Sequence, residues 1–253
     1  MRRDPRRGEA GGEVSIQPTR LTRRLRPTGQ HSAPDTPAAP SVPSEKGAEV
    51  GRRIGVGLMY GFWKPRVLGS WRVPATGPVI FAVNHSHNID GPMVMGVAPR
   101  PTHFLIKKEA FVGPLDPFLL RIGQLKVDRD STDRNAVTQA LDVLKNGGVL
   151  GIFPEGSRGE GDFAALRAGL AYFAVRGNAL IVPVAVLGSS ERQGRLLKGL
   201  PPLRSRVDVV FGDPFDASDG TGRRTRKALD EATERIQKQL TAHLENAKRL
   251  TGR

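Results

Sequence analysis

Two histidines and an aspartate stand close together in the stretch FAVNHSHNIDGP, residues 81–92. His85, His87 and Asp90 could be ligands of a catalytic metal, because His-x-His is a spacing found in zinc sites. Alternatively, His85 and Asp90 could be a general base and the carboxylate that orients it, with His87 as a bystander. The two interpretations predict different enzymes.

The metal interpretation needs more ligands than the sequence offers. A catalytic zinc ion takes about three protein ligands, mostly histidine or carboxylate. The chain has five histidines and no cysteine. His31 lies in a proline-rich stretch and His243 in a predicted helix, and no second cluster of histidine and aspartate supplies the missing ligands. We therefore predict no metal site.

The general-base interpretation needs only two residues. His85 follows the apolar run PVIFAV (78–83), and Asp90 comes five residues later, across a turn into the next predicted helix. The carboxylate would hold the proton of one imidazole nitrogen and raise the basicity of the other. Such a pair can deprotonate an alcohol without a serine or cysteine nucleophile. A core histidine beside a capping aspartate would show the same spacing.

Two further polar clusters follow predicted strands, GQLKVDR (123–129) and FPEGSRG (153–159). The guanidiniums of Arg129 and Arg158 can grip a phosphate in bidentate fashion, and the glycines allow backbone N–H groups to approach it. Glu155 could orient Arg129 or bond to a hydroxyl. Each arginine alone is explained as well by a surface salt bridge. Binding sites in α/β sheets lie at the carboxyl ends of the strands, and both clusters follow predicted strands. Together they favour a phosphate pocket beside His85.

The elements that must position these residues alternate between strand and helix. The apolar runs predict strands at 78–83, 102–107, 124–128, 149–153, 179–188 and 206–212. Apolar residues at helical spacing predict helices at 132–146, 163–176 and 223–249. The pattern predicts an α/β fold with a mixed, largely parallel sheet flanked by helices.

The chain divides into four predicted regions. Residues 1–48 are rich in proline and arginine and lack aromatics, so they should form a disordered tail. Residues 49–72 place aromatics beside basic residues on a short apolar helix, which is typical of an interfacial membrane-binding segment and equally of a helix packed on the core. We expect the core at 73–216 and a linker and helix at 217–253.

The net charge of +14 and the pI near 10.9 point to an anionic partner. Nucleic acid, a phospholipid surface and a polyphosphorylated cofactor all qualify, while an arginine-rich genome would raise the charge without any partner. No stretch reaches the roughly 20 apolar residues that span a bilayer, and no apolar region follows the N-terminal arginines as in a secretory signal. We expect a protein that is soluble or bound to a membrane face.

Taken in order, the polar blocks resemble those of the glycerolipid acyltransferases related to 1-acylglycerol-3-phosphate acyltransferase. NHSHNID resembles their Asn-His-x-x-x-x-Asp block, and GQLKVDR resembles the second block. FPEGSRG matches the third block residue for residue, and IVPVAV, with Pro183, resembles the fourth. The resemblance covers about residues 52–215. Two positions depart from it, His87 where a small polar residue is frequent and Lys126 where an apolar one is.

The resemblance implies an acyl transfer. His85, oriented by Asp90, would take the proton of a glycerol hydroxyl, and that oxygen would attack the thioester of acyl-CoA or acyl-carrier protein. Asn84 and Pro183 would shape the pocket. The residues implied to hold the phosphate of the acceptor are Arg129, Glu155, Gly156, Ser157 and Arg158. No cofactor is implied beyond the acyl donor as co-substrate.

On this basis we expect a peripheral enzyme of phospholipid biosynthesis on the cytoplasmic face of the cell membrane, making phosphatidic acid from 1-acyl-sn-glycerol 3-phosphate (lysophosphatidic acid). Its partners would be the phospholipid surface, the acyl donor and the lysolipid, with no nucleic acid. One alternative is the same chemistry on another lysophospholipid or a hydroxylated amino-acid lipid. Another is a non-catalytic basic module that docks on membranes or nucleic acid, although the intact pair of His85 and Asp90 argues against it.

Overall fold

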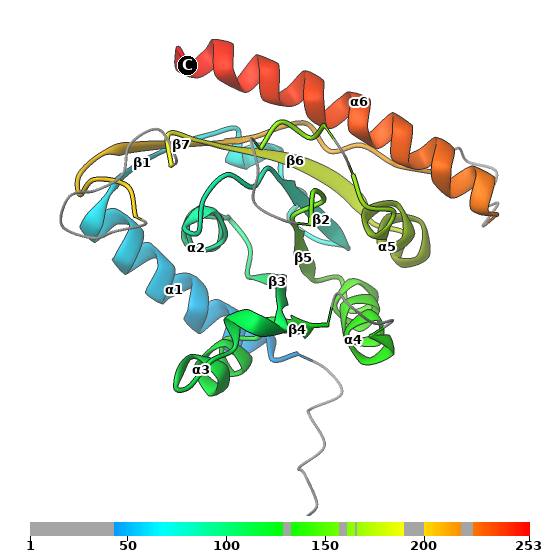
Figure 1. The fold of residues 1–253 in the computed structure, drawn as a ribbon, viewed down its shortest axis with the longest axis horizontal. Coiled ribbons are helices and arrows are strands. Elements are labelled where there is room, and N and C mark those ends of the chain that lie inside the picture. Colours follow the sequence, from blue (N-terminus) through cyan, green and yellow to red (C-terminus); the bar gives the residue numbers. More distant parts are fainter. Residues whose placement is uncertain (1–42, 129–132, 157–160, 165, 190–199, 219–224) are drawn as a thin grey trace, which may run out of the picture. The chain divides into compact units, whose positions relative to one another are not determined.

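The structure, a computed structural model, describes residues 43–128, 133–156, 161–164, 166–189, 200–218 and 225–253. Among these residues one sheet runs in the order β1-β7-β6-β2-β5-β3-β4 (Figure 1). Its strands are β1 (Lys64–Leu68), β2 (Val79–Val83), β3 (Thr102–Lys107), β4 (Leu125–Val127), β5 (Val149–Ile152), β6 (Leu180–Leu187) and β7 (Arg206–Phe211). The helices are α1 (Glu45–Phe62), α2 (Asp90–Val97), α3 (Leu115–Arg121), α4 (Arg134–Lys145), α5 (Gly169–Gly177) and α6 (Arg226–Thr251), with short 3-10 turns at Ser70–Arg72 and Lys108–Ala110.

The strand directions create one edge of the sheet that matters for function. The pairs β6/β2, β2/β5, β5/β3 and β3/β4 are parallel, so these five strands end at the same edge, which we call the site edge. β7 is antiparallel to β6 and parallel to β1, so β7 and β1 begin at the site edge. The predicted mixed, largely parallel sheet flanked by helices is therefore confirmed.

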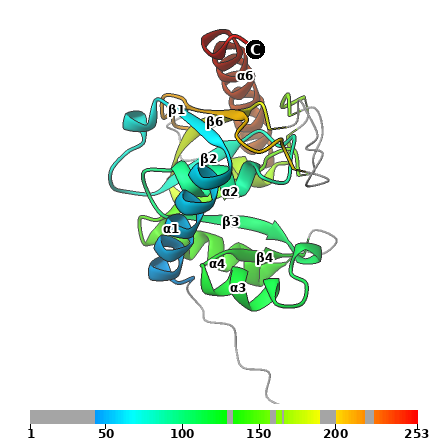
Figure 2. The same ribbon diagram turned by 90° about the vertical axis from the view of Figure 1, so that its left-hand side faces the viewer.

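The sheet is covered on both faces, which explains why its central strand is apolar throughout. α4, α5 and α6 contribute to the hydrophobic core on one face, and α1 and α2 to the core on the other (Figures 1 and 2). Every residue of β2 is buried, as the continuous run VIFAV predicts. Because β2 cannot shift without exposing that run, it fixes the position of the residues that follow it.

The N-terminal region differs from its prediction. α1 begins at Glu45, inside the stretch predicted to be disordered, because the side chain of Ser44 accepts a hydrogen bond from the backbone N–H of Gly47 at 3.0 Å and caps the helix. The predicted membrane-binding segment 49–72 also contains β1, which pairs with β7, so the sheet begins at Lys64 and not after residue 72. Residues 1–42 lie outside the described part of the chain.

The other helices add details that were not predicted. α5 begins at Gly169 and not at 163, because the described residues before it are non-helical and bury Phe163 at a φ of +60°. α4 is capped by Asp133, whose carboxylate accepts from the N–H of Ala136 at 2.9 Å. α6 buries Ile236, Leu240 and Leu244, so the predicted C-terminal helix is part of the core layer.

Contact between α1 and α2 depends on glycine. A Cβ added to Gly96 would lie 2.6 Å from the carbonyl carbon of Gly55, and one added to Gly55 would lie 2.9 Å from the Cα of Gly96. Backbone therefore meets backbone at this crossing, and no larger residue fits without moving the helices apart. Gly57, on the same helix, has open space around it.

We predict opposite effects of alanine at two glycines. Gly96→Ala should lower the free energy of unfolding by roughly 1–3 kcal/mol through overpacking, offset only in part by better helix propensity. Gly57→Ala should raise it by up to about 1 kcal/mol, because it gains helix propensity without a clash. Urea unfolding followed by circular dichroism measures both, and equal stability of Gly96→Ala and the wild type would contradict the close crossing.

Candidate active site

His85 and Asp90 meet at the site edge of the sheet. His85 follows β2, and Asp90 is the first residue of α2, so a short turn separates them. His85 Nδ1 lies 3.2 Å from Asp90 Oδ2. The same oxygen accepts from the backbone N–H of Ser86 at 2.9 Å and of His87 at 2.6 Å. Asp90, which is fully buried, thus holds both the imidazole and the turn that carries it.

An aromatic ring supports the imidazole from one face. Phe153, directly after β5, stacks on His85 with ring centroids 4.0 Å apart, and Phe104 of β3 stacks next to Phe153. With Nδ1 turned to Asp90 and one face covered, Nε2 is the nitrogen left for proton transfer. No role of Phe153 was predicted from the sequence, although its position directly after a buried strand indicates a place at the site edge.

The predicted pocket-shaping residues act within the sheet. Asn84 is buried, and its amide pairs with both backbone groups of Val186, donating at 3.1 Å and accepting at 2.7 Å. It therefore joins the end of β2 to β6. Pro183 lies in β6 opposite Ala82, and its carbonyl accepts from the N–H of Gly212 at 2.8 Å. Neither side chain lines the pocket next to His85.

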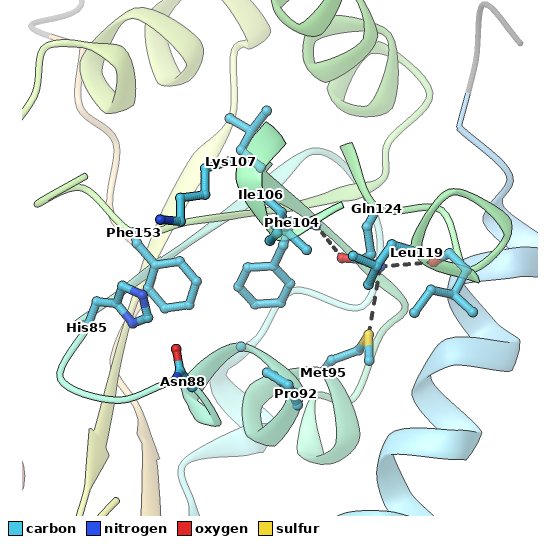
Figure 3. A pocket seen from close by; sticks show the side chains of 14 residues that line it. His85, Asn88, Pro92, Met95, Phe104, Ile106, Lys107, Leu119, Gln124 and Phe153 are labelled. Carbon is cyan, nitrogen blue, oxygen red and sulfur yellow. Dashed lines mark hydrogen bonds between the residues drawn. The ribbon is translucent and has the colours of Figure 1, made fainter. Parts of the chain in front are cut away.

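That pocket is an apolar cavity of about 490 Å³ which begins at His85 (Figure 3). His85 and Asn88 lie at one end, and Leu119 and Gln124 at the other. Buried Gln124 donates to the carbonyls of Thr102 and Ile122 and accepts from the N–H of Phe104, so its amide is satisfied by backbone. Most of the lining is apolar, from Gly91, Pro92, Met95, Phe104, Leu105, Ile106, Ala110, Leu119, Ile122 and Phe153.

Two of the predicted phosphate-binding residues, Glu155 and Gly156, lie just after β5, close to His85. Glu155 follows β5, and its carboxyl accepts from the backbone N–H of Phe163 at 3.3 Å and contacts the backbone N–H of His85. Burial raises the pKa of Glu155, an effect that these N–H groups oppose. Gly156 has a φ of +74°, and the guanidinium of Arg167 lies against it where a Cβ would stand. Arg167 is a cation beside this turn that the sequence analysis did not assign.

The remaining predicted phosphate ligands, Arg129, Ser157 and Arg158, lie outside the described residues. Their described neighbours follow β4 and β5, at the site edge. Asp128, directly after β4, pairs with Lys108 at 2.7 Å. The ends of β4 and β5 thus flank the edge on the side of His85 opposite to β6.

The other histidines among the described residues, His87, His103 and His243, bond to backbone. His103 Nδ1 lies 2.7 Å from the carbonyl oxygen of Gly123, and His243 Nε2 lies 3.0 Å from that of Val210. Burial lowers the pKa of both imidazoles, which favours their neutral form. The Nδ1 of His87 accepts from the N–H of Ile89 at 3.5 Å. In the described ranges, no three His, Cys, Asp or Glu side chains gather as metal ligands would.

Comparisons with known proteins agree with this architecture. A family model described as Acyltransferase matches residues 64–187. A 1-acyl-sn-glycerol-3-phosphate acyltransferase of Bacillus subtilis (strain 168) is 28% identical over 183 residues, which cover 72% of this chain and 88% of that protein. One of Streptococcus pneumoniae is 33% identical over 149 residues, 57% of this chain and only 51% of that relative.

A solved structure shares the fold. The 1-acyl-sn-glycerophosphate (LPA) acyltransferase PlsC from Thermotoga maritima superposes with a TM-score of 0.60 and 21% identity. The match covers 82% of this chain and 79% of that one. At this identity the likeness speaks for the fold alone.

The raised pKa of Glu155 makes a prediction about stability and pH. The folded state binds this proton more tightly than the unfolded chain does, so stability should fall as pH rises from the ordinary glutamate pKa through the raised one. Glu155→Gln removes the buried charge and keeps an acceptor for Phe163. Its gain in Tm over the wild type should therefore grow across that window and level off above it.

Thermal unfolding at a series of pH values measures this gain. Glu231→Gln, on exposed surface of α6, is the control and should show no such growth. A constant difference between Glu155→Gln and the wild type at all pH values would show that burial of the Glu155 charge is not limiting.

Proposed function

We propose that this chain, which belongs to the acyltransferase family and is an O-acyltransferase, converts 1-acyl-sn-glycerol 3-phosphate to phosphatidic acid. The observation that carries the proposal is a base, His85 held by Asp90, at the end of an apolar cavity. The names of the two bacterial relatives support this acceptor and a place in phospholipid biosynthesis. A non-catalytic basic module does not fit a chain of this family.

The reaction follows from the orientation of the imidazole. Asp90 accepts the Nδ1 proton, so the Nε2 lone pair of His85 takes the proton of the acceptor hydroxyl. The hydroxyl oxygen attacks the thioester carbonyl carbon and forms the new C–O bond. The C–S bond then breaks, and the imidazolium returns its proton to the leaving thiolate. Asp90 stabilises the transient imidazolium throughout.

The cavity suits the acyl chain of the donor. Its volume of about 490 Å³ falls within the roughly 300–1,000 Å³ of small-molecule sites, and its lining is largely apolar. A thioester carbon placed at His85 directs the chain past Phe153 and Phe104 toward Leu119 (Figure 3). Water is excluded along this path, which protects the thioester from hydrolysis. The donor would be acyl-CoA or acyl-carrier protein, bound as co-substrate.

The acceptor phosphate would lie next to His85, at the end of β5. Glu155 and Gly156 stand there in the structure, and the family resemblance adds Arg129, Ser157 and Arg158 from the same blocks of sequence. Glycine backbone N–H groups and guanidiniums are suited to a phosphate, while the Glu155 carboxyl can accept from a glycerol hydroxyl.

We expect the enzyme to act at the cytoplasmic face of the cell membrane, because its proposed substrates are membrane lipids. α1 packs on α2 at Gly51 and Gly55, while Val50 and Leu58 of the same helix are exposed. α3, close to the start of α1, exposes further apolar side chains (Figure 2). None of the described helices is long and apolar enough to cross a bilayer. Together with the charge of +14, these surfaces support peripheral binding to anionic lipid.

Replacement of His85 tests the chemistry. His85→Ala should lower kcat by roughly 10²–10⁴-fold, because the general base is lost. Thiol release from oleoyl-CoA, measured with a panel of lysophospholipids, gives the rate and the preferred acceptor, and thermal unfolding checks that the variant folds. Full activity of the variant would show that His85 is not the general base. Faster thiol release by the wild type with another lysolipid would identify that lipid as the acceptor instead.

Replacement of Leu119 tests the cavity. Leu119→Trp should fill its far end, so kcat/KM should drop about tenfold or more for oleoyl-CoA and remain near the wild-type value for octanoyl-CoA. Leu120→Trp, one residue along α3 and exposed, is the matched control. If Leu119→Trp changes kcat/KM for oleoyl-CoA and octanoyl-CoA by the same factor, as the control does, the acyl chain does not occupy this cavity.

A further inference from the structure

A cluster of basic side chains surrounds one buried carboxylate where β1 and β7 begin. Asp208 is fully buried, and its oxygens accept from Arg66 Nε at 2.6 Å and Arg253 Nε at 2.9 Å. Arg206 Nε lies 3.3 Å from the same carboxylate. Lys64 is the direct neighbour of Arg206 across the two strands, and Arg66 is the neighbour of Asp208. These residues share one face of the sheet, because side chains alternate along a strand.

Cationic side chains gather around Asp208, and two of them remain partly exposed. Arg66, Arg206 and Arg253 contact its carboxylate, and Lys64 lies opposite Arg206, where two like charges are unfavourable. Although Asp208 is buried, the side chains of Arg66 and Arg206 remain 38% and 49% exposed. A guanidinium has five N–H donors, so the bonds to Asp208 orient Arg66 and Arg206 and leave each of them with donors that Asp208 does not use.

The cluster lies next to the reaction centre. Asp208 is the register partner of Leu187, the last residue of β6. The guanidinium of Arg253 lies against Gly188, and the hydroxyl of Ser189 lies 3.3 Å from that of Ser86, the residue after His85. The cluster is therefore at the site edge on the β6 side of His85.

This side is opposite to the one assigned to the acceptor. Glu155 and Gly156 follow β5, and β2 lies between β5 and β6 in the sheet. A two-substrate transfer that couples a phosphorylated acceptor to a phosphorylated donor needs two anion sites, one on each side of the base. A CoA thioester carries a diphosphate and a 3′-phosphate, which oriented guanidiniums bind in bidentate fashion.

We propose that Lys64 and three arginines held by Asp208, namely Arg66, Arg206 and Arg253, bind the nucleotide phosphates of an acyl-CoA donor. The inference rests on the proposed acyl transfer and makes its donor a CoA thioester. The apolar cavity takes the acyl chain, and the nucleotide end lies along the beginnings of β1 and β7.

Binding of a CoA fragment tests the site without catalysis. Adenosine 3′,5′-bisphosphate, titrated calorimetrically, should bind the wild type and His85→Ala equally. Arg66→Gln combined with Arg206→Gln should weaken it about tenfold or more, and Arg206→Gln alone, at an exposed position, should weaken it in the same direction. Arg176→Gln, on exposed surface next to the opposite edge, should have no effect. Equal binding by all variants would overturn the proposal.

Kinetics separate the donor from the acceptor. The double variant should raise KM for oleoyl-CoA about tenfold while kcat and KM for the lysolipid stay unchanged. With oleoyl-pantetheine, which lacks the nucleotide, the double variant and the wild type should behave alike. An equal loss with both donors would show that the cluster only fastens α6 to the sheet, and lost binding to anionic vesicles with retained bisphosphate binding would assign it to lipid instead.

Failure of this site is distinguishable from failure of the proposed function. If another lysolipid is the true acceptor, the bisphosphate still binds and the double variant still loses affinity for it. If the bisphosphate does not bind while His85→Ala abolishes transfer from oleoyl-CoA, the acyl transfer stands and the donor site is wrong.

Discussion

The site depends on one oxygen of a buried carboxylate. Asp90 Oδ2 accepts from two backbone N–H groups and faces the imidazole of His85. A buried carboxylate is costly unless hydrogen bonds satisfy it, and each donor here belongs to the turn between β2 and α2. The amino end of α2 adds a favourable field for the negative charge. The carboxylate therefore stabilises the turn, and the turn in return holds the carboxylate beside the base.

Well-packed neighbouring elements hold His85 and Asp90 in place. β2 is buried along its whole length, Asn84 fastens its end to β6, and Phe153 from β5 stacks on the imidazole. α2, which begins at Asp90, is fixed by the backbone contact with α1 at Gly55 and Gly96. Three strands and two helices thus fix the position of His85. A shift of α2 at its crossing with α1 would move Asp90 as well.

Local patterns predicted the elements of this fold better than the contacts between them. Buried strands such as β2 and β5 are readable because both faces need apolar residues. The early start of α1 was missed because a proline-rich context outweighed the cap at Ser44. The pairing of His85 with Asp90 was predicted because five residues across a turn can bring them together, and the family resemblance favoured it over a core histidine beside a capping aspartate. The stacking of Phe153 and the contact of Arg167 with Gly156 join separate segments, so single-sequence spacing carries little information about them.

Strand direction explains why the basic cluster escaped sequence analysis and why it matters. In a fully parallel sheet the beginnings of β1 and β7 would lie at the edge away from His85, and Arg66 and Arg206 would read as remote surface charges. The antiparallel pairing of β6 with β7 reverses both strands and brings these arginines to the site edge. Asp208 then converts side chains from two strands and the end of the chain into one oriented group. A fold that is mostly parallel can in this way place cations on both sides of a base that follows its central strand.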